Sequence, residues 1–160
     1  MSERFLFWSD DQLALRAFDA ARLPPVANNR AARHFSDRNR WQRRMLHTFA
    51  YLRGRGLTPD WNWDSHVPQP IDKQRFLRLI APVDYAALPG FCINTLYFGL
   101  AGVKPLVMQS QVKLTCENDC AVAGLPADKL YLGYNDRALR NGLKPLLEER
   151  FPLPSRYERS

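Results

Sequence analysis

One segment constrains this chain more than any other, the arginine-rich stretch from Ser36 to Gly56. At 100° per residue, its core-type side chains fall on one side of a helix and its cationic side chains on the other. The first side holds Trp41, Met45, Thr48, Phe49 and Leu52. The second holds Arg40, Arg43, Arg44, His47 and Tyr51. The pattern predicts a helix over 37–54, capped by Ser36, whose apolar stripe must be buried in a core.

The positive charge of the chain is concentrated in the same segment. The 160 residues include 23 lysines and arginines against 16 aspartates and glutamates, which gives a net charge of +7. Between Arg30 and Arg55 lie eight arginines and a single acid, Asp37, and eight minus one equals the whole net charge. Guanidinium groups suit bidentate contacts with phosphate and stacking on bases. The segment therefore favours a polyanion as partner.

Two signals near the N-terminus predict another helix. Ser9 and Gln12 have the spacing of a capping box, in which each side chain satisfies a backbone N–H of the first turn. A modest apolar stripe follows, and Pro24 cannot continue a helix. We expect a helix near 10–22.

Two more helices are expected further along the chain. The segment near 72–80 predicts a short helix that turns Phe76, Leu77 and Ile80 inward. A C-terminal helix near 136–150 is capped by Asn135 and weakened by Gly142 and Pro145.

The strand signals lie between these last two helices. Apolar and polar residues alternate near 106–115, and 129–134 is a second strand candidate. We expect them to form a small antiparallel sheet, while 89–102 fits a buried helix or a buried strand equally well. Helices first and strands later indicate an α+β fold. The length fits one domain over 1–160, with a frayed tail at 152–160.

Composition indicates the setting of the chain. Residues 86–103 are apolar but are interrupted by prolines and glycines, which a membrane span of about 20 residues does not tolerate. The N-terminal apolar run is shorter than the roughly 7–15 residues of a signal peptide. Three cysteines are few and odd in number, as is usual in a reducing compartment. We expect a cytoplasmic protein that does not enter membranes.

The cationic side of the 37–54 helix is the leading candidate site. The side chains expected to contact nucleic acid are Arg30, Arg33, Arg40, Arg43, Arg44, His47, Tyr51 and Arg55. Arginines would neutralise backbone phosphates, and Tyr51 or a loop tryptophan, Trp61 or Trp63, would stack on a base. Two other interpretations stay open, a solvated helix face and a surface that docks on an acidic protein.

The three cysteines allow several states. Cys116 and Cys120 flank a predicted turn, where they could form a disulfide or contribute to a metal site, but no second ligand pair has zinc spacing. Unpaired thiols are the usual state in a reducing compartment, and that is our expectation.

Cys92 suggests nucleophilic chemistry if a helix begins at Pro89. The helix dipole would lower its thiol pKa, with His66 as base and Asp64 or Asp84 orienting the histidine. Buried cysteine in apolar surroundings is more often plain packing.

The loop near residue 60 offers a second chemical site. Asp60, Asp64, His66 and Asp72 have the residue types of a divalent-metal site, as a nuclease would need, but loop aspartates are ordinarily turn formers. No phosphate loop, dinucleotide fingerprint, nucleophile elbow or zinc-protease motif occurs.

These observations rank three functions. The leading hypothesis is a non-enzymatic protein, or a subunit of a nucleoprotein assembly, that binds the backbone of DNA or RNA and needs no cofactor or metal. The second is a structural or adaptor protein of a phage particle or secretion machine that docks on an acidic partner. The third is a small toxin-like metal-dependent nuclease.

Overall fold

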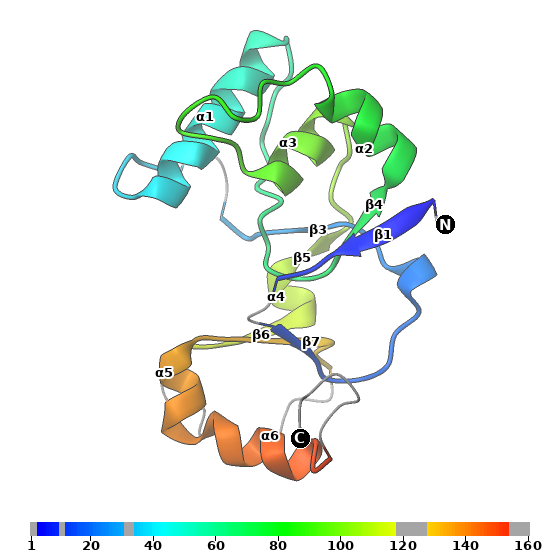
Figure 1. The fold of residues 1–160 in the computed structure, drawn as a ribbon, viewed down its shortest axis with the longest axis vertical. Helices are drawn as coiled ribbons and strands as arrows, with labels where there is room; N and C mark the ends of the chain where they lie inside the picture. The colour runs from blue at the N-terminus through cyan, green and yellow to red at the C-terminus, as the bar shows by residue number, and fades with distance from the viewer. Residues whose placement is uncertain (1–2, 10–11, 31–33, 118–127, 154–160) are drawn as a thin grey trace.

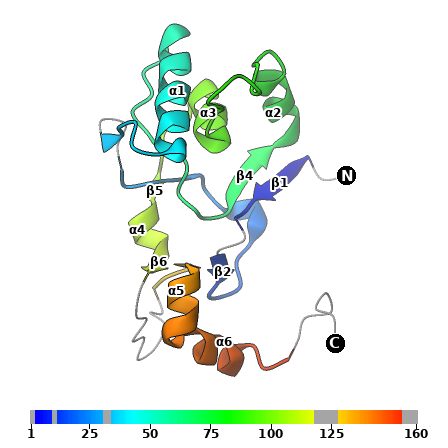
Figure 2. The ribbon, with the colours of Figure 1, turned by 60° about the vertical axis from the view of Figure 1, so that its left-hand side comes forward.

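The protein is described from a computed structural model, in which residues 3–9, 12–30, 34–117 and 128–153 are placed. Its elements gather in two regions, seen one above the other in Figures 1 and 2. The upper region, called here the helical body, contains α1 (Arg40–Gly54), α2 (Lys73–Ile80) and α3 (Ile93–Leu100). The lower region, the sheet body, contains the three-stranded sheet and the C-terminal helices. About 40% helix and 17% strand confirm the predicted α+β fold.

Helix α1 confirms the prediction over 37–54, with one change at its start. Asn39 caps it by accepting from the backbone N–H of Gln42, whereas Ser36 donates its own N–H and hydroxyl to the Gln42 side chain. Met45, Thr48, Phe49 and Leu52 are buried as the periodicity requires. The helix therefore begins at Arg40, three residues later than the predicted start at 37.

Helix α3 answers the question left open at 89–102. It packs on α1, where Gly99 lies so close to Leu52 that an added Cβ would be 2.6 Å from the leucine Cδ1. Helix α2 confirms the expected 72–80 helix, and Asp72 caps it by accepting from the Arg75 N–H at 2.6 Å. Of its predicted inward residues, Ile80 is buried but Leu77 is 51% exposed.

The loop before β4 (Gln69–Asp72) is the centre of the helical body rather than a surface connection. Trp63 is 1% exposed, and its backbone N–H donates to the hydroxyl of Thr95 on α3. The Gln69 amide, fully buried, bonds both the N–H and the carbonyl of Val26. Trp61, by contrast, is 41% exposed. Of the two tryptophans, Trp63 is therefore the anchor.

Two short strand pairs complete the helical body. Strand β1 (Arg4–Phe7) pairs antiparallel with β4, and β3 (Val26–Ala27) pairs parallel with β5 (Val107–Met108).

The prediction of a helix near 10–22 is wrong. The described part of that segment forms β2 (Gln12–Ala14) and a single 3-10 turn, η1 (Ala20–Arg22). The Leu15 N–H continues the pairing by donating to the Leu130 carbonyl at 2.8 Å, and the Leu15 side chain is buried. Pairing with a strand distant in sequence outweighs the local capping signal, because it satisfies the same backbone groups and also buries the apolar side chains.

The sheet of the lower body has strand order β2-β7-β6 and is mixed, not antiparallel as expected. Strand β7 (Tyr131–Tyr134) confirms the 129–134 prediction and pairs antiparallel with β2 but parallel with β6 (Lys113–Cys116). The strand expected over 106–115 is divided by α4 (Gln109–Val112). The division arises because β5 pairs in the helical body and β6 in the sheet body, so the chain must turn between them.

The C-terminal helix near 136–150 is confirmed but is bent. Asn135 caps α5 (Asp136–Ala138), as predicted, and η3 (Leu139–Leu143) and α6 (Lys144–Arg150) continue it. The bend falls at Gly142, whose φ of 117° is a conformation that favours glycine. The frayed tail expected at 152–160 lies mostly outside the described residues.

Candidate nucleic-acid interface

The outward side of α1 carries guanidinium groups with few partners in the protein itself. Arg38, Arg40 and Arg53 are exposed, and within the described part of the chain their side chains make no hydrogen bond or ion pair. Arg43 lies 3.9 Å from Asp37, and both side chains are at least half exposed. Such a pair contributes little, so the charge of this side remains uncompensated.

Arg44 and His47 have a structural task on the same helix. The Arg44 Nε donates to the Pro89 carbonyl at 3.1 Å, and the His47 Nδ1 lies 3.0 Å from the Gly90 carbonyl. The imidazole is also stacked on Phe91, with ring centroids 4.4 Å apart. These contacts hold the segment before α3 against α1. The terminal nitrogens of Arg44 are not used in these bonds.

Tyr51 is enclosed by its neighbours. The edge-to-face contact with Phe91 has a centroid distance of 5.3 Å, and the Arg55 guanidinium lies 5.0 Å above its ring. Its hydroxyl is buried without a hydrogen-bond partner among the described residues. A base could reach this ring only after Arg55 moved away.

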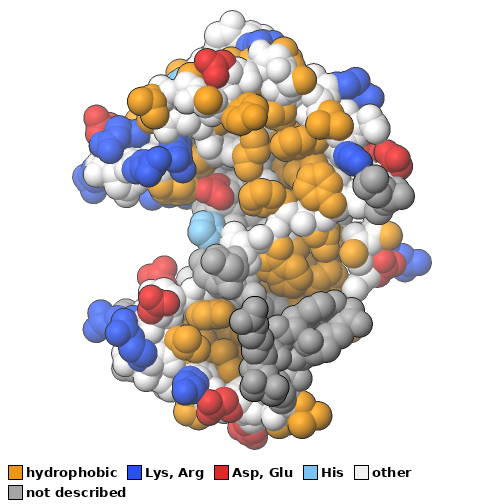
Figure 3. Space-filling model, viewed as in Figure 1, with side chains coloured by type: hydrophobic (Ala, Val, Ile, Leu, Met, Phe, Trp, Pro, Cys, Tyr) orange, Lys and Arg blue, Asp and Glu red, His pale blue; other side chains and the backbone are white. Residues whose placement is uncertain are grey.

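Arg30 extends the cationic side beyond the start of α1. Its guanidinium donates to the His34 carbonyl at 2.6 Å and lies 4.6 Å above the ring of Phe35, which packs on Trp41. Arg33, also predicted to bind nucleic acid, lies outside the described residues. Together these side chains form the basic surface of the protein, which consists of Arg30, Arg38, Arg40, Arg43, Arg53 and Arg55. Figure 3 shows blue side chains gathered over the start of α1, above a hollow between the two bodies.

Cys92 does not have the properties of a nucleophile. It stands at the N-cap position of α3, and its N–H donates to the Thr48 hydroxyl at 3.0 Å. Burial, aided by the negative charge of Asp64 and opposed by Arg44, raises the pKa of its thiol from 9.0 to about 12. Asp64 itself accepts from the indole N–H of Trp41. A raised pKa keeps the thiol protonated at neutral pH, which opposes the nucleophilic alternative and agrees with the favoured interpretation, a cysteine packed in the core.

The state of the other cysteines also differs from expectation. Cys116 is disulfide-bonded, so the prediction of unpaired thiols is wrong at this position. Cys120 lies outside the described residues. The sequence could have favoured the disulfide through the short Cys116–Cys120 spacing, but the expected reducing compartment argued against it.

The carboxylates of the loop near residue 60 do not converge. Asp72 caps α2 and Asp64 is engaged by Trp41, whereas Asp60 is exposed. Over the described ranges, no group of three or more histidine, cysteine or acidic side chains has metal-binding geometry. The geometry gives no support to the metal-dependent nuclease.

A groove between the two bodies was not anticipated from the sequence. It has a volume of about 500 Å³ and lies between the loop of His66 and the polar face of β6 and β7. Its lining includes Asn28, His66, Gln109, Lys113, Thr115 and Asn135. Gly133 within a strand was the one signal in the sequence, because such a glycine often marks the close approach of another group.

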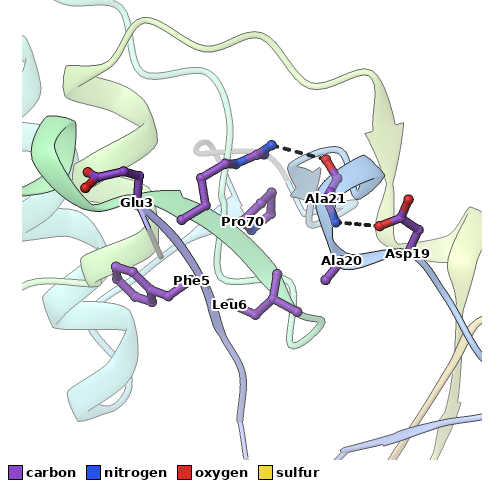
Figure 4. A pocket seen from close by; sticks show the side chains of 8 residues that line it. Glu3, Phe5, Leu6, Asp19, Ala20, Ala21 and Pro70 are labelled. Atoms are coloured by element: carbon purple, nitrogen blue, oxygen red, sulfur yellow. Dashed lines mark hydrogen bonds between the residues drawn. The ribbon is translucent and has the colours of Figure 1, made fainter. Parts of the chain in front are cut away.

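A second hollow, of about 610 Å³, lies between β1 and η1 (Figure 4). Its polar groups already bond one another, since Arg4 donates to the Ala21 carbonyl and Asp19 accepts from the Ala21 N–H. The Arg4 bond holds η1 beside β1. Because these groups are already paired, we do not take this hollow as a candidate binding site.

No family model, curated protein or solved structure matches this chain. In the parts of the chain that the structure places, none of the helices has the length and apolar character needed to cross a membrane.

Proposed function

We propose that the protein binds the phosphate backbone of DNA or RNA through the basic surface. The observation that carries this proposal is the set of exposed guanidinium groups on α1: Arg40 and Arg53 pair with no acid of the described chain, and Arg43 has only the exposed Asp37, at 3.9 Å. At a rise of about 1.5 Å per residue, the 15 residues of α1 extend about 22 Å, enough to follow several phosphates. The binding is therefore electrostatic and independent of base sequence.

Arginine rather than lysine favours nucleic acid over a generic acidic protein. A guanidinium group contacts phosphate in a bidentate manner and can also stack on a base. Arg44 strengthens this point, because its bond to Pro89 holds the guanidinium in place while the terminal nitrogens remain available. Arg33, His47 and Tyr51 remain predicted contacts of this interface.

Trp61 is the aromatic side chain best placed to stack on a base. It is 41% exposed and lines a shallow hollow with Leu52 and Leu57, at the end of α1 that carries Arg53. Stacking contributes about 1–3 kcal/mol per base on single strands, where bases are accessible. A Trp61→Ala variant should therefore weaken binding to a single strand and leave duplex binding nearly unchanged.

The test is fluorescence anisotropy with labelled single- and double-stranded DNA and RNA, titrated at several salt concentrations. We expect affinity to fall steeply with salt, and an Arg40→Ala/Arg43→Ala variant to reduce the log–log slope on duplex DNA by about 2, since each phosphate contact contributes about 0.9. The matched control is Arg78→Ala/Arg137→Ala, which removes the same charge from exposed positions on α2 and α5. It should bind like the original protein.

Equal losses in both double variants would show that only net charge matters and would contradict a defined interface. Absence of binding at low salt would instead favour the second function, docking on an acidic protein partner.

A cytoplasmic location belongs to this proposal. The Cys116 disulfide argues against it, because disulfides persist mainly outside reducing compartments. The test is to add a thiol-alkylating reagent to intact cells and to count the alkylated cysteines of the protein by mass spectrometry. One alkylated cysteine after denaturation without reductant would indicate an oxidising location, and three would agree with the cytoplasm.

A further inference from the structure

Helices α1 and α3 lie side by side, and they end in the same way (Figure 2). Gly56 and Gly102 follow them with φ of +74° and +64°, a conformation that favours glycine. In each case the N–H of the next residue, Leu57 or Val103, donates at 3.1 Å to a carbonyl five residues earlier. Both of these side chains pack against the core of the helical body. The negative ends of two helix dipoles therefore meet at one place.

The shallow hollow beside Trp61 lies at this meeting point and has a volume of about 190 Å³. Its floor is apolar, because the Leu52 and Trp63 side chains that line it are buried in the core of the helical body. Trp61, which is exposed, stands at its edge. Pockets for whole small molecules measure about 300–1,000 Å³, so this hollow suits one flat ring system rather than a complete nucleotide.

Two opposite charges line the hollow without pairing with each other. Asp60 and Lys104 are both exposed, and neither side chain makes a hydrogen bond or an ion pair within the described part of the chain. The Asp60 carboxylate lies where two helix ends already make the potential negative, so it attracts N–H donors and repels phosphate. Both groups are therefore open to a ligand that carries donors at one edge and an acceptor next to them.

We propose that this hollow binds one unpaired guanine base of a single strand, stacked on Trp61 with its Watson–Crick edge toward Asp60. The inference rests on the proposed function and adds a base preference to the sequence-independent contacts of the basic surface. Guanine carries two neighbouring N–H donors, at N1 and N2, beside the acceptor O6. The two oxygens of a carboxylate accept both donors at once, and the Lys104 ammonium group donates to the acceptor side of the base.

The other bases match these groups less well. Adenine and cytosine each place a ring-nitrogen acceptor beside a single amino group, and this acceptor would face the second carboxylate oxygen. Thymine and uracil have one N–H between two acceptors. In a duplex the Watson–Crick edge of every base is already paired, so the preference is expected only for single strands, whose bases are free to leave the stack.

The basic surface reaches the same end of α1. Arg53 directly follows Leu52, which lines the hollow, and its exposed guanidinium has no partner in the described chain. Arg55 lies just beyond the helix, where its guanidinium covers the ring of Tyr51. A phosphate next to the bound base can therefore contact Arg53 while the base itself occupies the hollow.

The experiment compares labelled oligothymidine strands that differ at one central base, by fluorescence anisotropy with the whole chain. The central base is thymine, guanine, adenine, cytosine or hypoxanthine, which is guanine without its N2 amino group. We expect the guanine strand to bind about tenfold more tightly than the thymine strand, because hydrogen bonds to a charged group are the strong ones. The hypoxanthine strand should lie between them, since it keeps only the N1 donor. A preference for adenine or cytosine would overturn the inference.

Two variants locate the base, and circular dichroism checks that each is folded. Asp60→Asn keeps the size of the side chain but replaces one acceptor by a donor, so it should abolish the guanine preference without weakening binding of the thymine strand. Trp61→Ala should instead weaken binding of every single strand. The matched control is Asp84→Asn, which removes the same charge from an exposed side chain that does not line the hollow. It should keep the guanine preference.

Failure of this inference is distinguishable from failure of the proposed function. Equal affinity for the guanine and thymine strands, still weakened in Arg40→Ala/Arg43→Ala, would refute the guanine site and leave backbone binding in place. A guanine preference that survives in Asp60→Asn would place the base elsewhere and refute the hollow. Absence of binding to every strand at low salt would refute both proposals together.

Discussion

The two bodies of this protein are held together in different ways. The helical body has a large aromatic and aliphatic cluster, threaded by buried polar side chains that bond backbone groups far away in sequence. The sheet body has a smaller cluster of five buried residues, made mainly by strand pairing and leucines. The difference teaches that a long loop can form the buried centre of a core when side chains satisfy its backbone groups.

The largest expected effect tests the polar network of the helical body. Gln69→Ala removes an amide that bonds the Val26 N–H at 3.2 Å, the Val26 carbonyl at 2.7 Å and the Ser65 hydroxyl at 2.8 Å. Leaving these groups buried and unpaired should lower the free energy of unfolding by about 4 kcal/mol. Urea denaturation measures this change in the free energy of unfolding. Gln74→Ala, exposed on α2, is the control and should change it by less than about 0.5 kcal/mol.

A core truncation in the sheet body tests whether the two bodies unfold separately. Leu143→Ala, at a fully buried position, should cost about 3 kcal/mol. Hydrogen exchange should show lost protection in β6, β7 and α5, with α1 and α3 unchanged. A uniform loss across both bodies would show a single cooperative unit and would support the predicted single domain.

Two glycines sharpen the description of the helical body. Gly99→Ala pushes a Cβ against Leu52 and should destabilise the protein by about 2 kcal/mol. Gly54→Ala, with open space around the added Cβ at the end of α1, should stabilise it by about 0.5 kcal/mol. Thermal unfolding monitored by circular dichroism gives both values. Equal effects would mean that α1 and α3 are not in close contact.

The last test is a pH dependence, which leaves stability unchanged at neutral pH and appears only above pH 9. Burial raises the pKa of the Cys92 thiol from 9.0 to about 12, so above pH 9 the unfolded chain releases a proton that the folded chain retains. Stability is therefore fully present below pH 9 and falls as the pH rises toward 12, by at most about 1.4 kcal/mol per pH unit for this group.

Burial also raises the pKa of Tyr131, from 10.0 to about 12, and adds to the loss above pH 10. Cys92→Ala should remove the part of the slope that begins at pH 9 and leave the part that begins at pH 10. Denaturation curves between pH 8 and 11 show this directly, and an unchanged slope in the variant would exclude Cys92 as its origin.

Signals contained within one or two helical turns were sufficient for part of the fold. The amphipathic pattern of α1 predicted its buried side, and Asn135 marked the start of the C-terminal helix correctly. The same reasoning misjudged 10–22, because β2 forms by pairing with β7, more than 100 residues later in the chain. A capping signal describes what a segment can do alone, and a distant strand changes which backbone partners are available to it.

The candidate sites also combine features that follow from one helix with features that depend on distant segments. The concentration of arginine in the basic surface is a property of the sequence, and the exposure of Arg40 and Arg43 follows from the period of one helix. That Arg44 and His47 hold the segment before α3 depended on a loop 40 or more residues away.

The sequence by itself determined the charge, the helix that displays it and the α+β class, because composition and periodicity are local quantities. Only the tertiary structure decided the parallel pairing of β6 with β7, the buried network around Gln69, and the groove where Lys113 lies over Gly133 facing the loop of His66. Each of these joins segments far apart in the chain, and the free energy that selects them comes from burial and hydrogen bonding across that separation.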